Sequence, residues 1–272
     1  MKHLRGRKIL VTRPLLQAEN LCNLIASQGG EAVRFPVLEI SPRQLEPNVL
    51  QAAMHCDWLI FTSANAVDFA IPLLNGKMPG LGAIRIAAVG EATAAALRRA
   101  GWRVDCAPAS QFGSEALLAE ACLQEPAGLR CVIVRGVGGR EKLAEILAKR
   151  GAEVSYLEVY KRLRPATDAT ALEHGLLTGR LDAVTITSVE ALRNLLAMVN
   201  ASSRALLTQL PLIVVSDRIG QAAVQLGFKR VTVSQQPADA AILDTLTSLF
   251  NGENSGRNNR KTTRASSAQC GG

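Results

Sequence analysis

The chain has 272 residues, of which 48% are hydrophobic and 20% charged, and its formal net charge is +8. This length allows one large domain or two ordinary domains with hydrophobic cores. No stretch is long and apolar enough to predict a membrane span, and the basic N-terminus leads directly into a strand without the apolar region of a signal peptide. We therefore expect a cytoplasmic protein.

The positive charge is divided between a folded part and a tail. Residues 251–272 are polar and glycine-rich and are predicted to be a disordered tail that carries +3, which leaves +5 on the rest. A modest positive excess suits an anionic ligand, but also an ordinary solvated surface. The low aromatic content (4%) and the lack of a nucleic-acid-binding motif argue against a nucleic-acid partner.

Cysteine and histidine residues are too scattered to indicate a metal site. The three histidines lie far apart in the sequence, and no CxxC pair occurs. We expect the cysteines to be reduced thiols of the core rather than disulfides or metal ligands. The six are Cys22, Cys56, Cys106, Cys122, Cys131 and Cys270.

The chain begins with a predicted strand, helix and second strand. The first strand is Lys8 to Thr12, and the helix extends to about Gln28, where glycines end it. The second strand is predicted from Ala32 to Ile40. The polar, proline-containing segment Ser41 to Pro47 is predicted to be a connector.

Short apolar strands then alternate with helices. The predicted strands Trp58 to Phe61 and Ile86 to Val89 each lead into a helix, and the second helix ends at Ala100. A short strand near Val104 to Cys106 follows, and then a loop that enters a helix. This order of elements is typical of a parallel sheet.

From Cys131 the first pattern returns. A strand (Cys131 to Val134), a glycine turn, an amphipathic helix (Arg140 to Arg150) and a strand (Val154 to Tyr160) form a βαβ unit. The alternating block then recurs as well, and its last predicted elements are the strand Val231 to Val233 and the helix Ala238 to Phe250.

Identities at fixed offsets show that both patterns are internal repeats. At an offset of 122 residues, the matches are Arg13 with Arg135, Glu19 with Glu141, Leu21 with Leu143, Ala26 with Ala148, Gly29 with Gly151, Glu31 with Glu153 and Val37 with Val159. At an offset of 125 residues, Asp57, Thr62, Ser63 and Ala66 match Asp182, Thr187, Ser188 and Ala191. We predict an α/β protein with two similar doubly wound parallel-sheet domains. The spacing leaves open which βαβ unit joins which block.

Polar turns at strand-to-helix junctions are the candidate ligand-binding positions. In parallel α/β sheets, anions collect at these junctions because helix N-terminal amides point toward them. The turns are Thr12-Arg13, Thr62-Ser63, Gly90 to Thr93 and Thr187-Ser188. Helix capping alone could explain each of them, and Thr187 with Glu190 has the spacing of a capping box. The use of Thr-Ser in both copies favours two anion-facing turns.

Two further features have competing interpretations. The GVGG run from Gly136 to Gly139 does not complete a dinucleotide-binding motif, and a tight strand-to-helix turn explains it better. Tyr160 ends a predicted strand, and its counterpart in the first repeat is Leu38. A hydroxyl present in one copy suits an asymmetric site. The alternative is a tyrosine that packs at a hinge with its hydroxyl in water.

Six short motifs together resemble the uroporphyrinogen-III synthase family over about Lys8 to Phe250. They are VTRP from Val11, FTSANAV from Phe61, AVGEATAAAL from Ala88, VIVRG from Val132, EVYKR from Glu158 and TITSVEAL from Thr185. The resemblance implies a crossed arrangement: residues 1–37 with 165–250 in one domain, 41–158 in the other, and linker strands at 36–41 and 158–165.

The resemblance also implies a reaction. Linear hydroxymethylbilane would lose water, its fourth pyrrole ring would be inverted, and the macrocycle would close to uroporphyrinogen III without a cofactor. Tyr160 falls on the family's catalytic tyrosine, which would donate a hydrogen bond to the leaving hydroxyl. The substrate could be handed over by hydroxymethylbilane synthase. The sequence itself leaves the oligomeric state open, and the lack of long apolar heptads or of an exposed apolar stripe favours a monomer.

The implied substrate carries eight carboxylates, which suits the polar turns. The positions expected to bind them are Arg13, Thr62, Ser63, Gly90, Thr93, Thr187 and Ser188. Where the family commonly has Gly-Pro-Thr-Thr, this chain has Ser216, Asp217, Arg218 and Ile219, so Ser216 and Arg218 are the expected substitutes. The alternative function is a two-lobed protein that binds a small anionic metabolite without chemistry, and it predicts that Tyr160→Phe changes little.

Overall fold

The computed structural model describes residues 3–74, 84–109, 113–139 and 141–251. It contains two compact units: unit 1 comprises Met1–Glu39 and Arg164–Gly272, and unit 2 comprises Ile40–Leu163. The chain therefore passes between the units twice. The first passage falls at the start of strand β3 (Glu39–Pro42), and the second at the end of strand β7 (Glu153–Leu163).

Unit 1 is built on a five-stranded sheet with the order β10-β9-β8-β1-β2. Each pair of neighbouring strands is parallel. The strands are β1 (Lys8–Val11), β2 (Glu31–Arg34), β8 (Ala183–Ile186), β9 (Pro211–Val214) and β10 (Arg230–Val233). The helices are α1 (Leu15–Ser27), α7 (Thr170–Leu177), α8 (Val189–Met198), α9 (Ala201–Leu207), α10 (Asp217–Gln225) and a last helix at residues 239–251.

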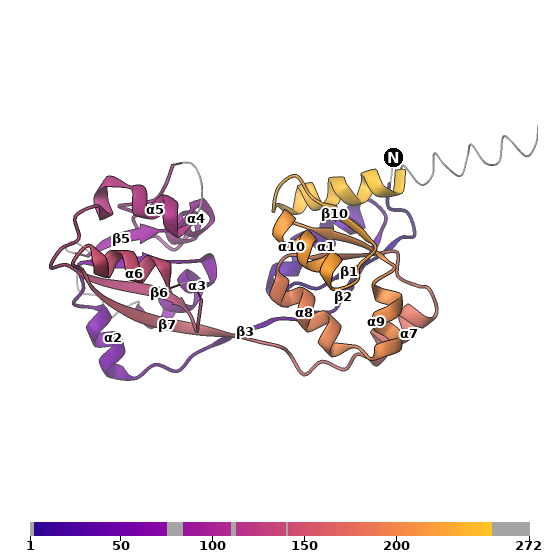
Figure 1. The fold of residues 1–272 in the computed structure, drawn as a ribbon, viewed down its shortest axis with the longest axis horizontal. Helices are drawn as coiled ribbons and strands as arrows, with labels where there is room; N and C mark the ends of the chain where they lie inside the picture. Colours follow the sequence, from indigo (N-terminus) through magenta and orange to yellow (C-terminus); the bar gives the residue numbers. More distant parts are fainter. Residues whose placement is uncertain (1–2, 75–83, 110–112, 140, 252–272) are drawn as a thin grey trace, which may run out of the picture. The chain divides into compact units, whose positions relative to one another are not determined.

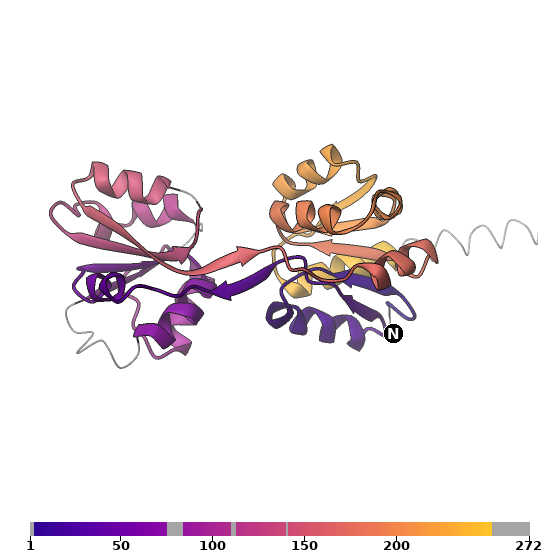
Figure 2. The same cartoon turned by 90° about the horizontal axis from the view of Figure 1, so that it is seen from below.

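Helices cover both faces of this sheet, because its strands are apolar on both sides. Ile9 and Val11 of β1 pack with α1 and the last helix, whereas Leu10 belongs to the cluster of α7, α8, α9 and α10. Figure 2 shows the indigo helix α1 and the orange helices on opposite sides of the sheet.

Unit 2 has a five-stranded sheet with the order β3-β7-β6-β4-β5. The pairs β7-β6, β6-β4 and β4-β5 are parallel, and an isolated parallel bridge joins Ala87 of β5 to Cys106. The remaining strands are β4 (Trp58–Phe61), β5 (Arg85–Ala88) and β6 (Arg130–Gly136). The helices are α2 (Pro47–Ala53), α3 (Ala64–Leu74), α4 (Glu91–Arg99), α5 (Ser114–Ala119), the short 3-10 helix η1 (Ala121–Leu123) and α6 (Lys142–Lys149).

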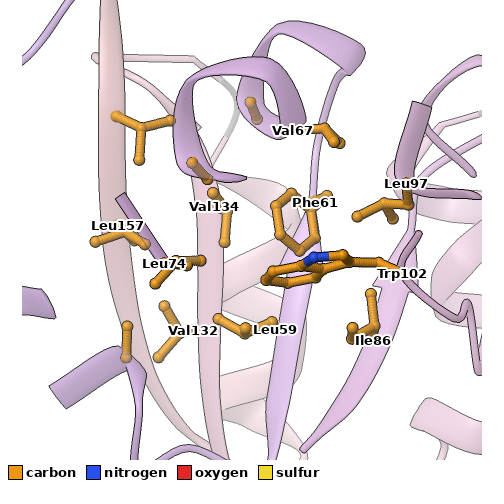
Figure 3. Packing of buried hydrophobic residues seen from close by; sticks show 14 of the residues in the cluster. Leu59, Phe61, Val67, Leu74, Ile86, Leu97, Trp102, Val132, Val134 and Leu157 are labelled. Atoms are coloured by element: carbon orange, nitrogen blue, oxygen red, sulfur yellow. The ribbon is translucent and has the colours of Figure 1, made fainter. Parts of the chain in front are cut away.

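The core of unit 2 is also two-sided. On one face, Phe61 meets Trp102 edge to face at a centroid distance of 6.0 Å, beneath α3 and α4, and Figure 3 shows this packing. On the other face, Trp58 and Ile60 pack with α5 and α6. Neighbouring residues of β4 thus point to opposite layers, as expected for a strand buried on both sides.

The two sheets share one strand order when the internal repeat is taken into account. The order β2-β1-β8-β9-β10 in unit 1 corresponds to the order β7-β6-β4-β5 in unit 2. The bridge at Cys106 beside β5 takes the place that β10 has in unit 1. Figure 1 labels β2, β1 and β10 of unit 1 and β7, β6 and β5 of unit 2. The prediction of two similar doubly wound parallel-sheet domains joined by a two-stranded linker is confirmed.

An aspartate carboxylate fixes the start of a strand at the same place in each repeat. Asp57 accepts a hydrogen bond of 2.7 Å from the backbone N–H of Arg130. Asp182 accepts one of 2.8 Å from the backbone N–H of Lys8. These bonds tie β4 to β6 and β8 to β1, the strand pairs at the centre of each sheet.

Several predicted elements differ from the structure. The strand predicted from Ala32 to Ile40 is divided into β2 and β3, because Pro36 lacks the N–H that a ladder needs. The connector predicted from Ser41 to Pro47 contains the end of β3 and the first residue of α2. The strand predicted near Val104 to Cys106 is reduced to the single bridge at Cys106. Residue 251 belongs to the last helix, and the rest of the predicted tail lies outside the described residues.

The prediction that all cysteines are reduced is wrong for one pair. A disulfide joins Cys106 and Cys122, whose Cα atoms are 6.6 Å apart. Cys22, Cys56 and Cys131 are free and buried as predicted, and Cys270 lies outside the described residues. Burial raises the pKa of Cys56 to about 12 and that of Cys131 to about 11, so both thiols stay protonated at neutral pH.

Over the described part of the chain, none of the helices has the length and hydrophobicity to cross a membrane. The same residues contain no group of three or more His, Cys, Asp or Glu side chains that could hold a metal ion.

Candidate functional site

The candidate site lies in unit 2, where two neighbouring strands send the chain to opposite faces of the sheet. After β4 the chain enters α3 on one face, and after β6 it enters α6 on the other. Such a switch point opens a crevice at the carboxyl ends of the strands, where α/β proteins bind ligands. A cavity of about 350 Å³ occupies this place. Its lining includes Thr62, Ser63, Val89, Gly113, Ser114, Ile133, Arg135, Gly136, Gly138, Gly139, Leu143, Tyr160 and Arg162.

Tyr160 is the most deeply buried polar group that lines this cavity. The residue is only 1% exposed. Its hydroxyl oxygen lies 3.2 Å from the Ser63 Oγ and accepts a hydrogen bond of 3.4 Å from the Arg162 Nη2. The ring packs against Phe69 at a centroid distance of 5.7 Å. The alternative of a hinge tyrosine with its hydroxyl in water is therefore wrong.

A glycine lets Tyr160 reach across the sheet. Tyr160 is on β7 and Ser63 follows β4, and β6 lies between these strands. Gly136, the last residue of β6, faces the Tyr160 ring so closely that a Cβ atom would lie 2.5 Å from two ring carbons. A register shift between Arg135 and Gly136 pairs Gly136 with Tyr160. The bare backbone at position 136 thus leaves the space that the phenol ring occupies.

The Thr62-Ser63 turn caps helix α3 beside the phenol. The Ser63 Oγ accepts a hydrogen bond of 3.1 Å from the Ala66 backbone N–H. The Thr62 hydroxyl donates to the Val134 carbonyl at 3.1 Å, which ties the end of β4 to β6. Both predicted residues line the cavity, and both hydroxyls already have protein partners.

Arg135 lies at the cavity wall and is held by two carboxylates. It is 8% exposed, and it donates to Glu141 at 3.0 Å and to Glu158 at 3.2 Å. Burial lowers its pKa, but the hydrogen bonds to Glu141 and Glu158 and the charge interactions with Glu141 and Tyr156 together raise it above its ordinary value. Its guanidinium also stacks on the Tyr156 ring, 3.8 Å from the centroid. Arg135 therefore stays charged and fixed in position.

Tyr156 and Glu141 complete this network. The Tyr156 hydroxyl donates to Glu141, and this hydrogen bond, with the one from Arg135, lowers the pKa of the Glu141 carboxyl. Burial, the hydrogen bond to Glu141 and its negative charge raise the pKa of Tyr156 to about 12. The phenol of Tyr156 is consequently a donor to Glu141 at neutral pH.

The GVGG run forms the turn between β6 and α6, as predicted. Gly138 and Gly139 have φ angles of 70° and 119°, which favour glycine. The Val137 backbone N–H donates to the Tyr160 carbonyl at 2.8 Å. Because Gly136, Gly138 and Gly139 line the cavity, the turn also leaves backbone open to a ligand.

The equivalent position in unit 1 is built differently. Ser188 caps α8 and accepts from the Ala191 N–H at 3.0 Å, as Ser63 does in unit 2. Ser188 is thus the cap that the sequence pattern placed at Thr187. Arg13, the counterpart of Arg135, forms an ion pair with Asp239, which also accepts from the Asn20 amide at 2.7 Å. Arg13, which was predicted to bind an anion, is thus already paired with a carboxylate of the protein.

The remaining predicted residues lie at the next strand ends. Gly90 precedes α4, and Thr93 in its first turn is 4% exposed. Ser216 precedes α10 but makes no capping hydrogen bond through its side chain. Arg218 is exposed, and no ion pair joins it to another residue of the described ranges. Gly90 and Thr93 lie outside the described lining of the Tyr160 cavity.

Four residues that line the cavity were not predicted from the sequence to be site residues: Arg135, Arg162, Gly136 and Ser114. Arg135 could have been found, because it repeats Arg13 at the end of an equivalent strand. Arg162 and Ser114 carried no such signal, since their place in the site depends on how the elements pack.

Comparison with known proteins identifies the family. A family model described as uroporphyrinogen-III synthase HemD matches residues 19–244. The chain belongs to the uroporphyrinogen-III synthase family. It is 34% identical over 245 residues to the uroporphyrinogen-III synthase of Escherichia coli K12, covering 88% of this chain and 99% of that protein. It is 33% identical to the Salmonella typhimurium LT2 enzyme, with the same shares covered.

Solved structures show the same fold. A mutant uroporphyrinogen III synthase from the extreme thermophile Thermus thermophilus matches with a TM-score of 0.63 at 19% identity, over 90% of this chain and 99% of that chain. The synthetase from Helicobacter pylori 26695 matches with a TM-score of 0.59 at 17% identity, over 89% and 99%. Membership of this enzyme family does not favour the alternative of a non-catalytic binding protein.

Proposed function

We propose that this uroporphyrinogen-III synthase family member closes linear hydroxymethylbilane to uroporphyrinogen III with inversion of the fourth ring, and that the Tyr160 cavity holds the reacting hydroxymethyl group. One observation supports this assignment of the site. The Tyr160 hydroxyl lies in a cavity at the switch point of unit 2, beside Ser63 and Arg162. This hydroxyl is a neutral donor at the position where α/β folds bind their ligands.

The first step needs a donor rather than a strong acid. The pyrrole nitrogen pushes electrons toward the hydroxymethyl carbon, so that the C–O bond breaks and a delocalised azafulvene cation forms. Tyr160 transfers its proton to the departing oxygen, which leaves as water. The cation then bonds to the α-carbon of the fourth ring that already carries the bridge to the third ring, and the older bond to that bridge breaks. The released bridge carbon bonds to the free α-carbon of the same ring, which inverts the ring, and the proton lost from that carbon restores the phenol. Substrate thus gives product and one water.

The surroundings of Tyr160 support this step. Burial of the phenol limits its contact with water, which strengthens a hydrogen bond made to a developing charge. The nearby Arg162 guanidinium stabilises negative charge on the phenol oxygen while the proton is shared. Because the substrate supplies most of the driving force, we expect a modest contribution from Tyr160.

The polar turns are proposed to bind substrate carboxylates. Helix N-terminal amides after Ser63, Gly90, Ser188 and Ser216 favour anions. The side chains of Thr62, Thr93 and Thr187 accompany these amides, and the exposed Arg218 adds positive charge. Arg13 would bind a substrate carboxylate only by exchanging its partner Asp239.

An isomer assay tests the proposed function. Purified protein receives freshly generated hydroxymethylbilane, and the oxidised products are separated into type I and type III uroporphyrin. Spontaneous closure gives type I, so a dominant type III product is the expected result. Type I alone, formed at the spontaneous rate, would overturn the proposal.

The proposal extends to the setting of the enzyme. We propose a monomer that acts in the cytoplasm, folds as domains 1–37 with 165–250 and 41–158, and receives its substrate from hydroxymethylbilane synthase. The buried free thiols support a reducing compartment, although the Cys106–Cys122 disulfide does not. Cell fractionation tests the location, and sedimentation tests the monomer. Limited proteolysis tests the domain bounds, and a coupled assay with an added substrate trap tests the transfer of substrate.

A further inference from the structure

The phenol oxygen of Tyr160 has more hydrogen-bonding neighbours than a simple donor needs. A phenol offers one proton and two acceptor positions. Arg162 can only donate, so its contact of 3.4 Å uses one acceptor position of the phenol oxygen. The Ser63 Oγ at 3.2 Å is the second neighbour, and either oxygen could be the donor by distance alone.

The helix cap holds the Ser63 hydroxyl beside the phenol and leaves it a proton to donate. The Ser63 Oγ already accepts the Ala66 N–H at 3.1 Å, which fixes one of its acceptor positions and the rotamer of the side chain. Its own proton remains to be placed, and the phenol oxygen lies within reach. When Ser63 donates, both acceptor positions of the Tyr160 oxygen are filled, and the phenol proton has no protein acceptor among these neighbours.

We propose that Ser63 and Arg162 are positioning residues that jointly direct the Tyr160 proton into the cavity, toward the departing hydroxyl of the substrate. Two donors on the phenol oxygen also stabilise the phenolate that forms as the proton leaves. Ser63 thereby acts through Tyr160 instead of through a substrate carboxylate. This inference rests on the proposed function of the site.

The internal repeat shows that this arrangement goes beyond helix capping. Ser188 makes the same cap in unit 1, at 3.0 Å, but the residue that matches Tyr160 there is Leu38. A serine at this turn is sufficient for the cap in both units. Only in unit 2 does its oxygen also meet a phenol.

The test compares single and double variants in the isomer assay. We expect Ser63→Ala and Arg162→Gln each to lower kcat by about tenfold with KM largely unchanged, as for the loss of one hydrogen bond to a charged group. Arg162→Lys should restore part of the rate, because lysine keeps a donor and the charge. In a Tyr160→Phe background, neither change should lower kcat further, since the phenol oxygen through which both act is gone.

Two control variants separate positioning from charge and from stability. Lys161→Gln removes the same charge from the adjacent residue of β7 and should leave kcat unchanged. Asn200→Ala removes the cap of α9, in which Asn200 accepts from the Ser203 N–H at 2.9 Å, so it should lower thermal stability without lowering kcat.

The outcomes distinguish this inference from the proposed function. If the unchanged protein makes no type III product, the proposed function fails. If it makes type III product but Ser63→Ala and Arg162→Gln keep full kcat, or lower it equally in the Tyr160→Phe background, the positioning role is overturned.

Discussion

The hydroxyl oxygens of Ser63 and Tyr160 lie 3.2 Å apart although 97 residues separate them in the sequence. Ser63 follows β4 and Tyr160 lies on β7, and these strands are not neighbours, because β6 lies between them. The pair therefore depends on a residue of β6 that has no side chain. Gly136 fills this role, and a functional site in unit 2 requires glycine there as much as it requires the tyrosine.

Gly136→Ala should displace the phenol and lower turnover. Its Cβ would lie 2.5 Å from the Tyr160 ring, which packs on Phe69 and cannot retreat freely. We expect kcat to fall at least as far as in Tyr160→Phe, measured as type III uroporphyrin formed.

Gly175→Ala is the matched control for this change. Gly175 lies in α7, and no atom lies within 4 Å of the position its Cβ would take. Its replacement should keep full turnover and leave stability equal or higher. Full turnover in Gly136→Ala would contradict the account of how Tyr160 reaches Ser63.

Asp57→Ala and Asp182→Ala should each destabilise the unit that contains the change. Each carboxylate accepts the first backbone N–H of the neighbouring strand, at 2.7 and 2.8 Å. Loss of the acceptor leaves that N–H without its partner and should lower the free energy of unfolding by about 1–3 kcal/mol. Hydrogen exchange followed by mass spectrometry measures this unit by unit. Increased exchange in the other unit alone would refute the assignment.

The titration of Tyr156 gives a pH-dependent prediction. The Tyr160→Phe variant leaves Tyr156 as the only tyrosine of the chain's two, so its tyrosinate absorbance reports one group. The midpoint should lie at about 12, and Glu141→Gln should lower it. A midpoint at the ordinary value of about 10 would show that neither burial nor the hydrogen bond to Glu141 raises the pKa of this phenol.

The same raised pKa has a consequence for stability. The folded state favours the neutral phenol of Tyr156, and the unfolded chain releases its proton at about 10. The contribution of this group is therefore complete below about pH 10 and is lost as pH rises toward about 12. Denaturant unfolding across this range should show a steeper loss of stability than in Tyr156→Phe.

Much of the fold could be predicted from the sequence, because buried strands such as β4 are continuous apolar runs and glycines mark the ends of the helices. Helices α2, α7 and α9 were not predicted. They have seven, eight and seven residues, so packing rather than periodicity stabilises them. The break at Pro36 was missed because Phe35 and Val37 are both buried and continue the strand pattern.

The site was less predictable than the fold. Thr62, Ser63 and Tyr160 were selected, and the structure brings them together at one cavity. Their mutual geometry depends on the order of β4, β6 and β7, which no local spacing contains. For Arg13 the local sequence was misleading. Its position at a strand-to-helix turn predicted an anion-binding residue, but Asp239, which is far away in the sequence, already forms an ion pair with it.

The most direct test of the central claim is the turnover of Tyr160→Phe in the isomer assay, measured beside Tyr156→Phe, which retains the ring over Arg135. The account predicts that Tyr160→Phe loses roughly 10- to 100-fold in kcat, a modest effect for a proton donor, with substrate binding largely kept, whereas Tyr156→Phe keeps its turnover. Equal turnover of Tyr160→Phe and the unchanged protein would contradict the catalytic role of the Tyr160 hydroxyl.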